Sequence, residues 1–144
     1  MKIGVFQDVH ANLPALQKAI GIFRSNKCDK IIHVGDLVAI GPYPKETMEL
    51  AMSIEEMEFI MGNHDHCYRF GLPEPIPAYM KQNEVDHQNW THSQIGQKYK
   101  DEVRNWKFEI DYEFTSLKIS FVHYGLNEEK NWFDIMLKNL MKQT

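Results

Sequence analysis

Polar side chains that could bind a divalent metal ion follow three short apolar segments of this chain. Asp8 and His10 come directly after the apolar residues 2–6, and Asp36 follows a second apolar segment. Asn63 and His64 follow a third, within the run Met-Gly-Asn-His-Asp. Carboxylate, amide and imidazole groups supply the oxygen and nitrogen atoms that divalent cations bind in proteins. The pattern therefore indicates metal-assisted chemistry.

Each motif also fits a role without a metal. Asp8 and His10 are two residues apart, so in an extended segment their side chains share a face about 7 Å apart. The same pair could instead form a solvated turn. Asp36 has two carboxylate oxygens and could bridge two cations, or it could cap the segment that follows. Asn63 could likewise bond the local backbone of a turn.

Further histidines and a cysteine surround these motifs. His123 ends an apolar segment next to a short Tyr-Gly sequence, where its imidazole could complete a metal site or be a partly buried structural group. His66 and Cys67 could line such a site or simply belong to a loop. His33 lies inside an apolar segment, and we expect it to be structural.

The elements that must position these residues follow a β-α-β-α-β order. Strands are expected at residues 2–6, 31–34 and 57–61. Asn12 is expected to cap a first helix that Asn26 closes, and a second helix is expected at residues 45–52. This order predicts a parallel sheet with right-handed crossovers, and in such sheets ligands bind beyond the carboxyl ends of the strands.

The second half of the chain has a looser pattern. Residues 66–77 are rich in Pro, Gly and aromatic residues and are expected to form a loop over the site. Thr91 resembles the first residue of a capping box, which predicts a helix from there to Trp106. Strands are expected at residues 112–114 and 117–122, joined by a turn, and an amphipathic final helix is expected at residues 133–141.

Composition places the chain among soluble globular proteins. It has 144 residues, which predicts a single domain over 1–144, with 43% hydrophobic and 25% charged residues. The net charge of −4 gives no attraction to nucleic acid or to an anionic membrane, although a bound metal would still admit a small phosphorylated substrate. The two cysteines lack metal-binding spacing, and no signal peptide or membrane segment is recognisable. We therefore expect a cytoplasmic protein.

Together, the motifs resemble those of the calcineurin-like metallophosphoesterase superfamily, and in particular its small bacterial and archaeal phosphoesterases. The resemblance rests on Asp-x-His at residues 8–10, Gly-Asp at 35–36, Gly-Asn-His-Asp at 62–65 and His-x-Gly at 123–125. It implies an α/β fold in which a β-sandwich is flanked by helices. It also implies two divalent metal ions, with manganese expected first and iron, zinc, nickel or calcium as alternatives.

The resemblance further implies a role for each residue. One ion would be held by Asp8, His10 and Asp36. The other would be held by Asp36, Asn63 and His123. His64 would be the catalytic acid or charge stabiliser, with Asp65 orienting it, and a metal-activated hydroxide would attack phosphorus in a phosphomonoester or phosphodiester.

The chain departs from the family pattern after His123. The family has a further Gly-His-x-His motif that gives one ligand to each metal, and no histidine follows His123 here. The second sheet is also expected to be incomplete. The chain thus resembles a C-terminally shortened member: a natural truncation, a partial chain, or a protein whose missing ligands come from solvent or a second subunit. A homo-oligomer could cover the incomplete sheet.

Two functional alternatives follow from that departure. The chain could be a weakly active or inert relative that binds only a metal or a partner. A nucleotide-binding α/β module without a metal is the more distant alternative, because the sequence has neither a Gly-x-Gly-x-x-Gly motif nor a P-loop lysine motif.

Overall fold

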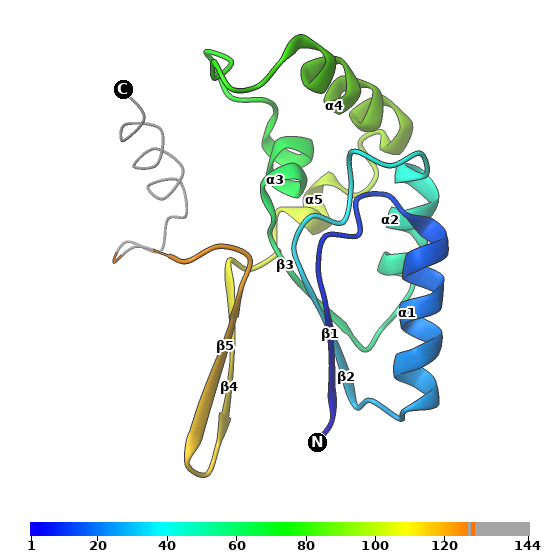
Figure 1. Ribbon diagram of the computed structural model, residues 1–144, viewed down its shortest axis with the longest axis vertical. Coiled ribbons are helices and arrows are strands. Elements are labelled where there is room, and N and C mark those ends of the chain that lie inside the picture. Colours follow the sequence, from blue (N-terminus) through cyan, green and yellow to red (C-terminus); the bar gives the residue numbers. More distant parts are fainter. Residues whose placement is uncertain (127, 129–144) are drawn as a thin grey trace.

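The computed structural model describes residues 1–126 and residue 128. Three parallel strands in the order β1-β2-β3 form the central sheet: β1 (Ile3–Phe6), β2 (Lys30–Val34) and β3 (Met57–Ile60). Two helices connect them: α1 (Leu13–Ser25) and α2 (Pro44–Met52). Figure 1 shows both helices on the same side of the sheet. The expected β-α-β-α-β order and the parallel pairing are confirmed.

Local sequence explains where α1 begins and ends. The Asn12 side-chain oxygen accepts a hydrogen bond from the Ala15 N–H at 3.2 Å, which satisfies one of the free donors of the first turn. Pro14 stands in that first turn, where its missing N–H costs little. The helix ends at Asn26, as expected, and it buries Leu16 and Ile20 against the sheet.

Alternate residues of β2 pack on opposite faces of the sheet. Ile31 belongs to the core under the helices, whereas Ile32 and Val34 pack against Ile110 on the other face. Successive side chains of a strand point in opposite directions, so a strand that is buried on both faces is apolar almost throughout. The second face is covered by a β-hairpin.

That hairpin is the second, smaller sheet. Its antiparallel strands are β4 (Glu109–Phe114) and β5 (Leu117–Val122), joined at Thr115 and Ser116. The Met61 N–H donates to the Lys107 carbonyl at 2.7 Å, which ties the start of the hairpin to the end of β3. The expected hairpin is confirmed, and so is the expected α/β fold, with one parallel sheet and one small antiparallel sheet in the described residues.

Three helices lie between the two sheets in sequence: α3 (Asn63–Phe70), α4 (Gln82–Ile95) and α5 (Lys100–Val103). The predicted loop at residues 66–77 is therefore wrong over its first part. Thr91 does not start a helix but is buried inside α4. The start of α4 is capped instead by Glu84, whose carboxylate accepts the Lys81 N–H at 2.9 Å.

Two further expectations concern the rest of the chain. Among the described residues, no helix has both the length and the apolar character needed to cross a bilayer. The final helix expected at residues 133–141 lies outside the described residues.

Candidate metal centre

The ends of all three parallel strands converge on one edge of the sheet. Asp8 and His10 follow β1, Asp36 follows β2, and Asn63 and His64 begin α3 directly after β3. The backbones of Asp8, His10 and Asp36 have φ values of 55°, 47° and 60°. Left-handed conformations at residues other than glycine cost about 1–3 kcal/mol each and concentrate at functional sites.

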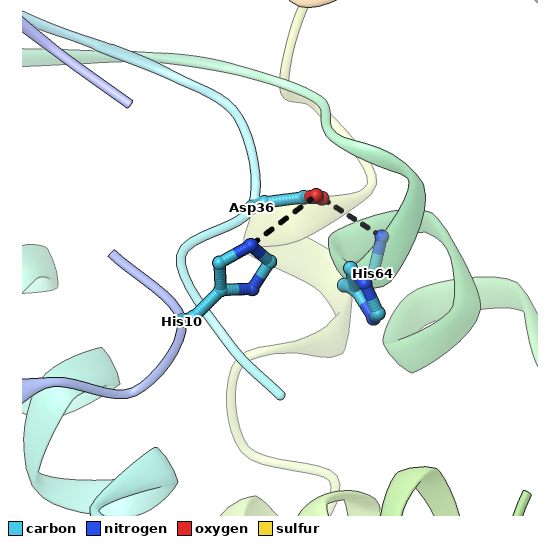
Figure 2. Close-up of side chains that lie close together, drawn as sticks. All are labelled: His10, Asp36 and His64. Atoms are coloured by element: carbon cyan, nitrogen blue, oxygen red, sulfur yellow. Dashed lines mark hydrogen bonds and ion pairs between the residues drawn. The ribbon is translucent and has the colours of Figure 1, made fainter. Parts of the chain in front are cut away.

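Asp36 is the centre of this edge. Its side chain is buried, and Figure 2 shows its carboxylate between the His10 ring and the backbone of His64. One oxygen, Oδ1, accepts the His64 N–H at 2.9 Å. The other, Oδ2, lies 4.0 Å from Nε2 of His10 and 3.4 Å from Nε2 of His123. Burial opposes ionisation, but the hydrogen bond from His123 and the nearby His64 hold the pKa of Asp36 below its usual value.

Two groups of potential ligand atoms share Asp36. One group is His10, Asp36 and His64, and the other is Asp8, Asp36 and His123, with the ligand atoms of each lying within 4.8 Å of one another. A carboxylate common to two ligand sets is what a pair of cations about 3.5–4 Å apart requires. The donor atoms are carboxylate oxygens and imidazole nitrogens, a mixture that suits several divalent transition metals.

His123 is already oriented toward Asp36. Its Nδ1 lies 2.7 Å from the Val34 carbonyl oxygen, and the only donor such a pair allows is the ring N–H. Nε2 is thereby left to face Asp36, in the way that backbone carbonyls orient metal-binding histidines. Burial lowers the pKa of His123, but the hydrogen bond and charge of Asp36 outweigh it and raise that pKa.

Asn63 lies at the same edge, with its carbonyl engaged by a residue that the sequence did not indicate. Its Oδ1 accepts a hydrogen bond from the Tyr124 hydroxyl at 3.0 Å. Tyr124 follows His123, so the only sequence signal for it was that neighbour. The ligand role expected for Asn63 stays a prediction.

Asp65 has a different set of contacts from the one expected. Its carboxylate is fully buried and accepts the N–H groups of Asp36 at 2.8 Å, Leu37 at 3.0 Å and Gly62 at 3.1 Å. These bonds join the turn after β2 to the turn after β3. Burial and the negative charge of Asp36 raise the pKa of Asp65 to about 7 despite these donors. Asp65 therefore positions Asp36 directly.

The His64 ring contacts the His10 ring and Gln88 of α4. The Gln88 amide nitrogen meets Nδ1 of His64, and the Gln88 side chain is almost completely buried. Sequence patterns did not indicate this contact, because Gln88 lies 24 residues from His64 and α4 was not expected there. Burial is the main cause that lowers the pKa of His64.

His33 and Cys67 belong to neither group of ligand atoms. His33 is fully buried among the rings of Phe6, Phe59 and Trp106, as expected for a structural residue. Burial raises the pKa of the Cys67 thiol to about 11, which leaves it protonated and unreactive at neutral pH.

Comparison with known proteins identifies the family. The family model described as calcineurin-like phosphoesterase matches residues 1–143. The chain belongs to this family. The order and spacing of the motifs at the three strand ends therefore indicated the correct family.

Two relatives from Methanocaldococcus jannaschii show similarity to parts of this phosphoesterase-family chain. An uncharacterized protein is 34% identical over 64 residues, which is 44% of this chain and 26% of the relative. A phosphodiesterase is 45% identical over 40 residues, which is 28% of this chain and 24% of the relative. The matched segments thus span about a quarter of the length of each of these relatives.

Solved structures show the same fold. A metallophosphoesterase from Sphaerobacter thermophilus is similar with a TM-score of 0.57 and 28% identity, covering 76% of this chain and 43% of that protein. A hypothetical protein from Pyrococcus horikoshii is similar with a TM-score of 0.68 and 15% identity, covering 97% and 65%. The second likeness concerns the fold alone.

Proposed function

We propose that this chain is a metal-dependent phosphoesterase that hydrolyses phosphomonoesters or phosphodiesters at a site for two divalent cations, with manganese the first candidate. The observation that carries this proposal is the buried Asp36 carboxylate, which is common to two groups of ligand atoms. Family membership supports phosphoester hydrolysis as the reaction class.

The assignment of residues to the two cations is the one that the family resemblance implies. Asp8, His10 and Asp36 form the first set, in which Nε2 of His10 lies 3.4 Å from the Asp8 carboxylate and 4.0 Å from that of Asp36. Asp36, Asn63 and His123 form the second. The chemistry that bound cations supply at such a site is a hydroxide nucleophile at neutral pH and neutralisation of phosphate charge.

His64 is the proton or hydrogen-bond donor in this proposal. Gln88 occupies its Nδ1, so only Nε2 is free to meet the substrate. From there the ring could protonate the departing alkoxide or stabilise negative charge on the phosphoryl group. Asp65 affects His64 only through Asp36. Its hydrogen bonds to the backbone fix the position of Asp36, and the Asp36 carboxylate in turn accepts the His64 N–H.

The test is hydrolysis of p-nitrophenyl phosphate and bis-(p-nitrophenyl) phosphate with added Mn2+. His64→Ala should lower kcat by about 10² to 10⁴, the usual contribution of a general acid. Asp36→Asn should abolish the Mn2+-dependent turnover, because an amide has only one oxygen and no negative charge with which to hold two cations. Glu55→Gln removes a negative charge from an exposed position and is the matched control. Turnover that survives both site variants unchanged would refute this site.

A second candidate is a relative that binds metal or a partner with little or no turnover. The observation that favours it is that each group of ligand atoms in the described residues contains only three residues. Catalytic sites do function with three protein ligands and water, so the count alone does not decide. The p-nitrophenyl ester assay together with calorimetry separates the candidates: Mn2+ binding without turnover would favour the second, and Mn2+-dependent turnover would contradict it.

A further inference from the structure

A pocket of about 530 Å³ opens directly beside the proposed catalytic residues. Asn63 and His64 line it together with residues of α4: Asn83, Glu84, His87 and Gln88. A group bonded to phosphorus on the His64 side would therefore extend into this pocket. A volume between about 300 and 1,000 Å³ is typical of sites for small organic molecules.

The mouth of the pocket is apolar. Ile40 and Tyr79 line it, and their side chains are 61% and 46% exposed. Two exposed side chains of this kind, one of them aromatic, offer an apolar surface on which the flat face of a ring can pack.

Two polar side chains of α4, His87 and Gln88, also line the pocket. The Gln88 amide nitrogen meets His64, and the Gln88 Oε1 and the His87 Nε2 are buried out of reach of solvent. Neither atom therefore presents a charge or a free hydrogen-bonding site to a molecule in the pocket.

The charge of the pocket is negative. Glu84 lines it, and none of the ten described lining residues is a lysine or an arginine. The start of α4 would otherwise attract an anion, but the Glu84 carboxylate already accepts the Lys81 N–H there at 2.9 Å. A second phosphate or a carboxylate would therefore meet a like charge.

We propose that this pocket binds the leaving group of the substrate, and that this group is an uncharged planar ring. The proposal rests on the proposed phosphoesterase function. In the reaction, the oxygen of water bonds to phosphorus and the phosphorus–oxygen bond to the ring-bearing alcohol breaks. The departing oxygen takes a proton, and the alcohol leaves from the pocket.

The first experiment measures binding without metal and without phosphate, so it does not depend on catalysis. Ligand-observed NMR compares 4-hydroxybenzamide with 4-hydroxybenzoate, two rings of the same shape that differ in charge. The amide should bind at least about tenfold more tightly, as expected for a like charge several ångströms from Glu84. Tyr79→Ala should weaken binding of the amide, because Tyr79 supplies part of the apolar mouth.

Two charge variants are the controls for that experiment. Glu84→Gln should reduce the preference for the amide, and glutamine can still cap the helix. Glu55→Gln removes the same charge at an exposed position outside the pocket and should leave the preference unchanged. If the benzoate binds as tightly as the amide to the unmodified protein, the proposal is wrong.

The second experiment repeats the comparison with the phosphate monoesters of the same two rings and Mn2+. The carbamoyl ester should have the higher kcat/KM, again by about tenfold. If neither ester nor a p-nitrophenyl ester is hydrolysed while the rings still bind selectively, the phosphoesterase function fails and the leaving-group role of the pocket fails with it, although the selectivity of the pocket for uncharged rings stands. Hydrolysis of both esters at equal rates would contradict the pocket assignment alone.

Discussion

Replacement of Gly62 by alanine tests the positioning of Asp36 without replacing any of the proposed metal ligands. A Cβ atom at Gly62 would lie 2.2 Å from the backbone nitrogen of Asp36 and 2.2 Å from its Oδ1. Both distances are far below van der Waals contact. Gly62 has a φ of −96°, which alanine adopts readily, so the effect of the change is steric and not conformational.

The structure sets the size of the expected effect. Relief of the overlap requires a shift of about 1 Å between two close-packed turns, and overpacking of this kind costs about 1–3 kcal/mol. The shift would also strain the bonds from Asp36 to Asp65 and from His64 to Asp36, and a buried bond that is lost adds about 1–3 kcal/mol. We expect Gly62→Ala to destabilise the fold by about 2–5 kcal/mol.

Metal affinity should fall as well. Displacement of a group that orients a ligand typically costs about 10- to 100-fold in affinity, so calorimetry should find Mn2+ binding weaker by at least tenfold. Urea unfolding of the metal-free protein measures the stability term separately.

Gly21→Ala is the control for this prediction. Gly21 lies inside α1, and a Cβ there would have no neighbour within 4 Å. Alanine should stabilise the helix by about 0.5–1 kcal/mol and leave Mn2+ affinity unchanged. The reasoning is refuted if Gly62→Ala behaves like Gly21→Ala in both measurements.

Three further predictions concern single side chains. Asp65→Asn should lower the melting temperature, by an equivalent of about 2–4 kcal/mol, because the amide cannot accept all of the N–H bonds made by the carboxylate; an unchanged melting temperature would contradict this. Burial lowers the pKa of His33 to about 3, so the unfolded chain binds its proton first, and His33 alone should lower the stability by about 1.4 kcal/mol per pH unit as the pH falls from about 6.5 toward 3. His33→Leu should reduce the slope of stability against pH by that amount in urea titrations at several pH values. Tyr124→Phe should leave Mn2+ affinity unchanged or raised, since it frees the Asn63 oxygen, whereas a tenfold loss in calorimetry would make the hydroxyl part of the site.

The sequence was informative where function depends on strand ends. Apolar runs followed by Asp8, Asp36 and Asn63 were enough to predict the parallel sheet and the edge where these residues meet, because parallel strands end together. His123 was also predicted at this edge, since the alternation in residues 117–122 indicated a strand that ends there.

Contacts made across the fold were beyond that reasoning. The family resemblance implied that Asp65 orients His64, whereas the Asp65 carboxylate accepts hydrogen bonds from the backbone after β2. Gln88 was missed because the sequence pattern at Thr91 resembled the start of a helix. The helix α4 in fact starts earlier, at a capping box formed by Lys81 and Glu84 that was not recognised in the sequence. Local propensity indicates which segments are helical, but the partner of a buried polar group depends on how those segments pack.

The hydrogen bond between His123 and Val34 means that the metal centre lies where the hairpin meets the parallel sheet. His123 follows the hairpin, whereas Val34 ends β2 of the parallel sheet and Asp36 follows it. A cation shared by Asp36 and His123 would join the two layers at the point where each contributes one ligand. Cation binding and docking of the hairpin then share one free energy, because whatever stabilises the docked state also favours the bound ion. Removal of the cation by a chelator should therefore speed hydrogen exchange in β4 and β5 more than in β1 and β2. The reason is that the hairpin would lose the link to the parallel sheet that the cation provides.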